Sequence, residues 1–247
     1  MLPIRDHNPS GRRPFVTYTL IAINVIIFAS FNIPMGESRA LNLFFAEWGM
    51  VPAFISEGER LYTLITTQFL HGGFMHIAGN MLFLWIFGDN MEDEMGHFGF
   101  LIFYLACGAL AALAQWVVDP YSYVTTIGAS GAIAGVMGGY LLLFPKAKVD
   151  ILLILIIYFK IFSVPAWIML GVWFVLQLGN GVISDPDLGG VAYWAHAGGF
   201  VVGFIFSIPV FLRLGASQFW RDNDFHPPHP EAKYNLSASR IPLVRRK

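Results

Sequence analysis

The sequence predicts an all-α, polytopic membrane protein, and three observations lead to that prediction. Hydrophobic residues make up 56% of the 247-residue chain and charged residues only 13%, about half the charged share of a typical soluble domain. Several uncharged apolar runs reach roughly the 18 residues needed to cross a hydrocarbon core as helix. When these runs are threaded through a membrane in turn, thirteen of the fifteen lysines and arginines lie on the same side of that membrane. The net charge of −1 gives no reason to expect a nucleic-acid partner.

We expect six spans in a lipid bilayer. The only ambiguous stretch is 151–183, which as one helix would rise about 50 Å, too long for one span and too short for two with a turn. Because Pro165 disfavours helix at Val164, we expect an interfacial connector over 151–163 and a new helix with Pro165 in its first turn. The six predicted spans are 15–33, 69–88, 98–118, 127–144, 165–183 and 191–212.

The positive-inside rule then fixes the orientation. With the N-terminus in the cytoplasm, only Arg39 and Arg60 of the basic residues lie outside, and a seventh span would move the basic tail outside as well. The predicted organisation is a cytoplasmic segment 1–14, a six-span domain 15–213 and a polar, mobile cytoplasmic tail 214–247. We expect an integral multi-pass protein of the plasma or inner membrane. The first span lacks a small-residue cleavage site and is too long for a signal-peptide core, so we expect it to be retained.

Four polar residues lie inside predicted spans, where such groups are costly and indicate function. They are His76, Asn80, Ser130 and His196. The topology predicts that all four lie about 5–15 Å below the outer surface, on three helices. Taken singly, each has an ordinary structural interpretation: a serine bonding its own backbone, a packing or proton-relay histidine, an asparagine joining helices. Their shared depth and side favour a common site instead.

Small residues at a four-residue period would bring two of these helices into close contact. Such spacing lets membrane helices approach with their backbones nearly touching. A serine–histidine hydrogen bond of about 2.6–3.2 Å requires that approach, because both side chains are short. The two series are Gly131, Gly135 and Gly139 behind the serine, and Ala195, Gly199 and Gly203 around the histidine.

Together, these motifs resemble those of the rhomboid intramembrane serine proteases, over residues 71–203. The matching motifs are His76-x-x-x-Asn80, Gly88-x-x-x-Glu92-x-x-x-Gly96, Gly128-Ala129-Ser130-Gly131 and Ala195-His196-Ala197-Gly198-Gly199 followed by Gly203.

The resemblance implies a six-helix bundle, a role for each matching residue, and no metal or cofactor. Ser130 would be the nucleophile and His196 the general base, while His76, Asn80 and the backbone around Gly128 and Ser130 would bind the oxyanion or substrate. Glu92 would hold the inner turn without taking part in the chemistry. The substrates would be transmembrane proteins, cut near the outer end of a span.

Two positions depart from the family pattern. Many members carry a Trp-Arg pair where this chain has Tyr62 and Thr63, and an aromatic residue where it has Ala134. The second departure means that some other group must orient His196. Because no acidic residue lies near His196 in its span, we expect a catalytic dyad and not a triad.

Three other functions remain to be weighed. A catalytically inactive rhomboid-like protein that binds or chaperones membrane clients is the main alternative, although such relatives typically lack the serine or the histidine. A transporter would predict repeated halves with broken helices, and no such repeat is visible. A soluble hydrolase would need Gly-x-Ser-x-Gly after a strand, whereas residue 132 is alanine.

Overall fold

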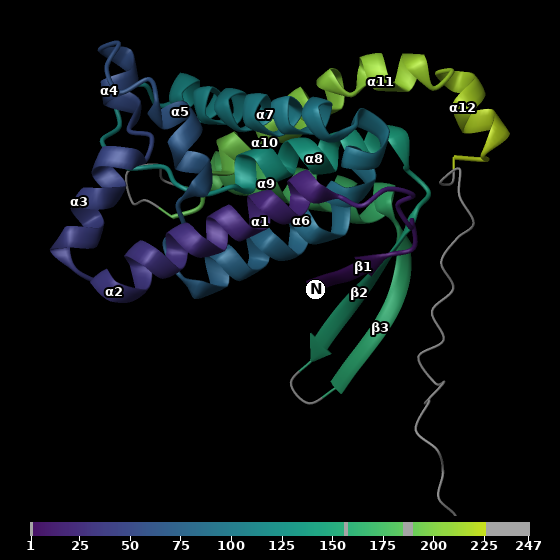
Figure 1. The fold of residues 1–247 in the computed structure, drawn as a ribbon, viewed down its shortest axis with the longest axis horizontal. Coiled ribbons are helices and arrows are strands. Elements are labelled where there is room, and N and C mark those ends of the chain that lie inside the picture. Colours follow the sequence, from purple (N-terminus) through teal and green to yellow (C-terminus); the bar gives the residue numbers. More distant parts are fainter. Residues whose placement is uncertain (1, 156–157, 185–189, 226–247) are drawn as a thin grey trace, which may run out of the picture.

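The computed structural model describes residues 2–155, 158–184 and 190–225 and is mainly helical (Figure 1). The long helices lie side by side in a bundle, with short helices at one end and a small sheet at the other. The long helices are α1 (Phe15–Ile27), α6 (Phe74–Met95), α7 (His97–Val118), α8 (Ser130–Leu143), α9 (Ala166–Ile183) and α10 (Tyr193–Phe206).

Each predicted span overlaps one of these helices, although α6 continues to Met95, beyond the predicted end at residue 88. The multi-pass helical fold class is confirmed. In the described part of the chain, four helical stretches are long and apolar enough to cross a membrane: Phe15–Met35, His97–Val118, Ala166–Ile183 and Tyr193–Arg213. A fifth candidate is the pair Thr63–Phe69 and Phe74–Met95, which is bent by 97°. Helix α8 has only 14 residues, so the count of six full spans stays a prediction. Helix α1 continues through the π-helical turn η1 (Phe28–Asn32) and α2 (Ile33–Met35).

Helix α8 forms the centre of the bundle. All of its residues except Ser130 and Leu141 are buried, and α6, α7, α9 and α10 pack around it. The expected close approach to α10 is confirmed: a Cβ atom on Gly199 would overlap the carbonyl of Gly131, and one on Gly203 would overlap that of Gly135. A short, fully surrounded helix therefore carries the candidate serine into the interior.

A three-stranded antiparallel sheet lies at the opposite end of the bundle from the short helices α3 (Arg39–Trp48) and α4 (Pro52–Ser56) (Figure 1). The connector expected over 151–163 folds into β2 (Lys148–Leu155) and β3 (Tyr158–Pro165), and β1 (Leu2–Asp6) adds a strand from the segment 1–14. The β-branched and aromatic residues of these segments favour strands. Pro165 precedes α9 directly, one residue before the helix begins.

Asp150 joins the three strands of this sheet. Its carboxylate accepts hydrogen bonds from Arg5 Nε at 2.8 Å and from the Ser163 hydroxyl, and it lies 2.9 Å from His7 Nε2. Burial alone would raise the pKa of Asp150, but these partners lower it below its ordinary value. The ionised carboxylate therefore stabilises the attachment of the N-terminal strand.

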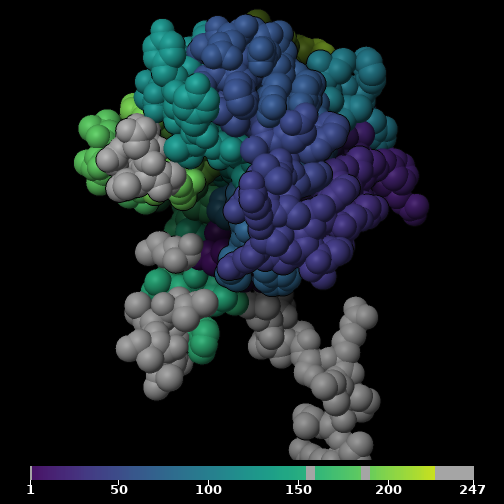
Figure 2. Space-filling view, turned by 90° about the vertical axis from the view of Figure 1, so that its left-hand side faces the viewer, coloured from purple at the N-terminus to yellow at the C-terminus, as the bar shows by residue number. Residues whose placement is uncertain are grey.

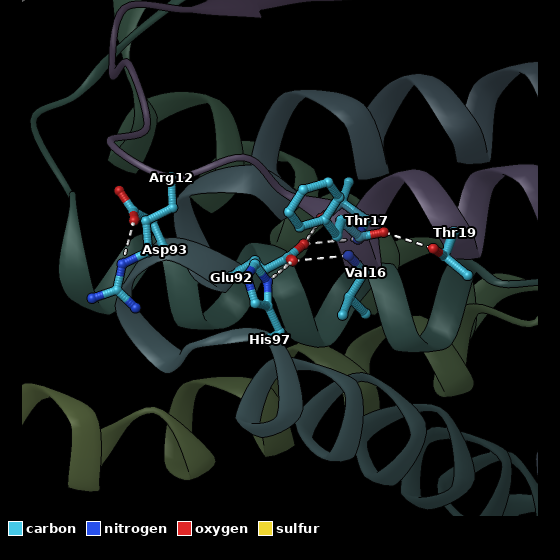
Figure 3. A network of polar contacts seen from close by, with 8 residues as sticks. Arg12, Val16, Thr17, Thr19, Glu92, Asp93 and His97 are labelled. Atoms are coloured by element: carbon cyan, nitrogen blue, oxygen red, sulfur yellow. Dashed lines mark hydrogen bonds and ion pairs between the residues drawn. The ribbon is translucent and has the colours of Figure 1, made fainter.

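Glu92 has the structural role that the resemblance implied (Figure 3). Its side chain is 2% exposed, and its two oxygens accept from the backbone N–H groups of Val16 and Thr17 at 2.8 and 2.7 Å. The Thr17 hydroxyl also donates to it, and His97 Nδ1 lies 2.5 Å away. One carboxylate thus satisfies the free N–H groups of the first turn of α1 and links α1 to α6 and α7.

The segment between α2 and α6 folds over the other end of the bundle. It contains α3 (Arg39–Trp48), α4 (Pro52–Ser56), α5 (Thr63–Thr66) and the 3₁₀ turn η2 (Thr67–Phe69). Figure 2 looks onto this end, where blue and purple residues of this segment lie beside teal residues of the loop before α8. At the Tyr62–Thr63 departure, Tyr62 donates to the Glu47 carbonyl at 3.0 Å, and Arg60 Nη1 donates to the Ala46 carbonyl at 2.9 Å. These two bonds hold α3 in place.

The beginning of the predicted tail packs against the bundle. After α11 (Ile208–Arg213), the helix α12 (Ser217–Asp222) buries Phe219, and Trp220 Nε1 donates to the Leu142 carbonyl at 3.1 Å. These two aromatic side chains explain why residues 214–225 are attached. The rest of the predicted tail, 226–247, lies outside the described residues, and the domain boundary at residue 213 stays a prediction.

Candidate active site

Ser130 is the first residue of α8, and a tight loop delivers it there. Gly128 has φ +133°, a conformation that side-chain-bearing residues rarely adopt, and its N–H donates to the Thr67 carbonyl at 3.0 Å. A Cβ atom at Gly128 would lie 2.8 Å from His76 Nε2 and 3.4 Å from Ser130 Oγ. The glycine is therefore needed both for the turn and for the space between these two side chains.

His196 is the fourth residue of α10 and lies directly opposite the serine. Its Nε2 atom is 2.7 Å from Ser130 Oγ, within hydrogen-bond distance. The two residues are 66 positions apart in the chain, and they meet because the glycines of α8 and α10 let the two backbones pack closely. This is the separation that a nucleophile and its general base require.

His76 and Asn80 come from the first two turns of α6 and line the same cavity, of about 190 Å³, as Ser130, Gly128 and His196. The Gly72 N–H donates to His76 Nδ1 at 3.3 Å. In the neutral ring the proton then lies on Nε2, the atom nearest Gly128. The buried Asn80 Nδ2 has no hydrogen-bond partner among the described residues. Two donors are thus available to a ligand in the cavity.

Two contacts of His196 were missed by sequence analysis, and both come from α9. Gln177 Oε1 lies 2.8 Å from His196 Nδ1, and the Trp173 ring lies 5.9 Å from the imidazole, centroid to centroid, at 31°. Gln177 is one of two amide-bearing residues in a span that is otherwise apolar, so the rule that singled out Asn80 would also have found it. Nothing in the sequence alone indicates that α9 faces His196.

The site has no carboxylate among the hydrogen-bond partners of His196 in the described part of the chain: these partners are Ser130 and Gln177. Within the same residues, no group of three or more His, Cys, Asp or Glu side chains is arranged to hold a metal ion. The arrangement is a hydroxyl within hydrogen-bond distance of an imidazole, beside two further polar side chains that line the same cavity. This chemistry suits acyl transfer.

Comparison with known proteins places this geometry in a family context. A family model described as the rhomboid domain matches residues 58–213. Rhomboid protease GluP of Bacillus subtilis is 31% identical over 193 residues, which cover 78% of this chain and 34% of the relative. The putative rhomboid protease YdcA of the same organism is 30% identical over 128 residues, 52% of this chain and 61% of YdcA. The mitochondrial rhomboid protein 1 of Saccharomyces cerevisiae is 29% identical over 77% of this chain and 52% of its own length. The chain therefore spans less than two thirds of each of these relatives.

Proposed function

Because the chain belongs to the rhomboid family, an integral membrane family with members named as proteases, we propose that it is an active intramembrane serine endopeptidase. It hydrolyses peptide bonds of transmembrane proteins near the outer membrane face, through a Ser130–His196 dyad and an acyl-enzyme. Both termini are cytoplasmic in this proposal, and residues 15–213 form the catalytic domain. The 2.7 Å separation between Ser130 Oγ and His196 Nε2 is the observation that carries the proposal.

The first half of the reaction forms the acyl-enzyme. His196 Nε2 takes the proton from Ser130 Oγ as that oxygen attacks the carbonyl carbon of the scissile bond. The tetrahedral intermediate then expels the amine, which receives the same proton from the imidazolium. In the second half, water attacks the ester while Nε2 takes a proton from it, and Ser130 leaves with that proton restored.

His76 and Asn80 supply the electrostatic part of the proposal. Both residues line the cavity that Ser130 also lines: the Nδ1 atom of His76 is already bonded to the Gly72 N–H, and the buried amide nitrogen of Asn80 has no other partner in the described chain. Donors that are fixed before the reaction stabilise a developing oxyanion without the cost of reorganisation. Since a stable helix keeps its carbonyls bonded, the substrate segment must unwind locally before attack, and segments with Gly, Ala or Pro are favoured.

The test is cleavage of a single-span reporter by purified protein in liposomes, together with labelling by a fluorophosphonate probe. We expect the wild type to cleave the reporter and to be labelled at Ser130. Ser130→Ala and His196→Ala should lose both the cleavage and the labelling. Ser207→Ala is the matched control, because the Ser207 hydroxyl donates to the Gly203 carbonyl of its own helix. A chelator should leave cleavage unchanged. Binding of membrane clients without cleavage or labelling by wild type would instead support the inactive client-binding function.

A further inference from the structure

The imidazole of His196 is contacted by two residues of α9 in addition to Ser130 of α8. The residue one turn after Ser130 is Ala134, which is completely buried and carries only a methyl group. The groups that contact the imidazole on its other side, Trp173 and Gln177, are one turn apart on the same face of α9. Helix α9 therefore supplies both an aromatic contact and a hydrogen bond.

The bond at Nδ1 determines which ring nitrogen carries the proton. The Trp173 carbonyl can only accept a hydrogen bond, and the side-chain Nε2 of Gln177, which can donate one, lies 3.5 Å from it. This leaves the amide oxygen, Oε1, facing His196 Nδ1 at 2.8 Å. Since Oε1 only accepts, the neutral imidazole must carry its proton on Nδ1 and keep the lone pair on Nε2. Nε2 is the atom next to Ser130 Oγ.

We propose that Gln177 is the positioning residue of the dyad: its neutral amide fixes His196 in the tautomer that accepts a proton from Ser130. This inference rests on the proposed function and deepens it. Gln177 takes the place that an aspartate holds in a triad, but it contributes a dipole and not a charge. Its oxygen also stabilises the imidazolium that forms after proton transfer, more weakly than a carboxylate would.

The position of Gln177 in α9 argues against a role in packing alone. The three buried residues of this helix are Ala166, Leu170 and Gln177, and most of its remaining side chains are exposed and apolar. A buried amide in an apolar helix is costly unless it is hydrogen-bonded. A leucine or methionine would fill the same volume without that cost, so the amide is explained by what it bonds.

The test separates positioning from structure by comparing two substitutions at one residue. Gln177→Met keeps length and volume but removes the acceptor, whereas Gln177→Glu keeps an oxygen that accepts from Nδ1. Asn180→Leu is the matched control, because Asn180 is the other amide-bearing residue of α9 in the described chain. The measurements are kcat and KM on the reporter, the rate of fluorophosphonate labelling, and the midpoint of thermal unfolding in detergent.

We expect Gln177→Met to lower kcat and the labelling rate by about 10- to 100-fold, the range found when an outer-shell partner of a functional histidine is removed. KM should stay within about twofold. Gln177→Glu should recover most of the rate, and Asn180→Leu should match wild type. A Gln177→Met protein that is labelled at the wild-type rate overturns the inference while leaving the proposed function intact. Absence of labelling in wild type overturns the proposed function and this inference with it.

A measurement on the unmutated side chain keeps the inference testable even if Gln177→Met does not fold. In ¹⁵N-histidine-labelled wild type, the His196 signal is identified by its absence from His196→Ala. We expect Nδ1 to have the shift of a protonated ring nitrogen and Nε2 that of an unprotonated one. The opposite assignment for the neutral ring overturns the inference.

Discussion

Two buried polar residues of helix α6, Asn80 and Glu92, differ in how completely their side chains are hydrogen-bonded. The Glu92 carboxylate accepts from two backbone N–H groups and a hydroxyl and also contacts His97. Asn80, three turns earlier, has an amide nitrogen with no partner in the described chain, and it lines the cavity beside Ser130. A buried polar group that is fully bonded stabilises the fold, whereas one left unbonded costs stability and remains available to a ligand. The difference separates the end of α6 that is bonded into the fold from the end that lines the candidate site.

The largest expected effect is on the structural side of this comparison. Glu92→Ala leaves the N–H groups of Val16 and Thr17 and the ring of His97 without their acceptor, which should destabilise the protein by about 1–3 kcal/mol for each buried donor left unbonded. Glu92→Gln keeps one acceptor oxygen and should cost less. The check is thermal or denaturant unfolding in detergent, with activity corrected for the folded fraction. An unchanged unfolding midpoint in Glu92→Ala would contradict a structural role.

Asn80→Leu tests the functional side. Removal of an oxyanion donor should lower kcat about 10²- to 10³-fold, while stability should stay equal or rise because the amide nitrogen has no partner to lose. The matched control is Asn24→Leu, since the buried Asn24 amide bonds the Leu20 carbonyl of its own helix. Reporter cleavage and unfolding are measured on both variants. If Asn80→Leu lost stability in proportion to activity, the contrast with Glu92 would disappear.

The sequence predicts the residues of the candidate site better than it predicts the helix and the sheet that pack around them. Polar residues in apolar runs identified Ser130, His196, His76 and Asn80, because their cost in a membrane makes them conspicuous, and these four side chains line one cavity. The approach of α8 and α10 was predictable because small residues recur at the helical period. The roles of the four residues in catalysis remain predictions.

The contacts from α9 and the sheet could not be predicted in the same way. The contact between Gln177 and His196 depends on how α9 is rotated about its axis, which hydropathy does not specify. The sheet depends on pairing between residues about 145 positions apart, such as Arg5 and Asp150. Strand pairing at that distance leaves no periodic signal in either segment, so the sequence predicts only a cytoplasmic segment over 1–14 and an interfacial connector over 151–163.

A smaller effect is expected in the sheet. Asp150→Asn removes the charge that accepts from Arg5 and Ser163, which should weaken the attachment of β1 by about 1–3 kcal/mol, the range for hydrogen bonds to a charged group. Hydrogen exchange should quicken at the amides paired between β1 and β2 and stay unchanged in α8. Equal acceleration in both places would mean that the sheet and the bundle unfold together. In that case, the sheet would not be a separate structural unit.

A dependence of stability on pH is expected at Asp6, the last residue of β1. Its side chain accepts from the Tyr140 hydroxyl at 2.7 Å, and burial, helped by the nearby carboxylate of Asp89, raises its pKa from 3.8 to about 8. Between about pH 4 and pH 8, the folded state therefore keeps a proton on Asp6 that the unfolded chain has already released. The free energy of unfolding falls as pH rises through this window. Above about pH 8 the carboxyl is ionised in both states and no further stability is lost.

Asp6→Asn isolates this contribution, because the amide remains neutral at every pH and keeps an oxygen that can accept from Tyr140. The unfolding midpoints of wild type and Asp6→Asn are compared at pH 5, 7 and 9. We expect the variant to gain stability relative to wild type as pH rises, with hydrogen exchange in β1 slowing in parallel. A difference that is constant across the three pH values would mean that Asp6 has the same protonation in the folded and unfolded states.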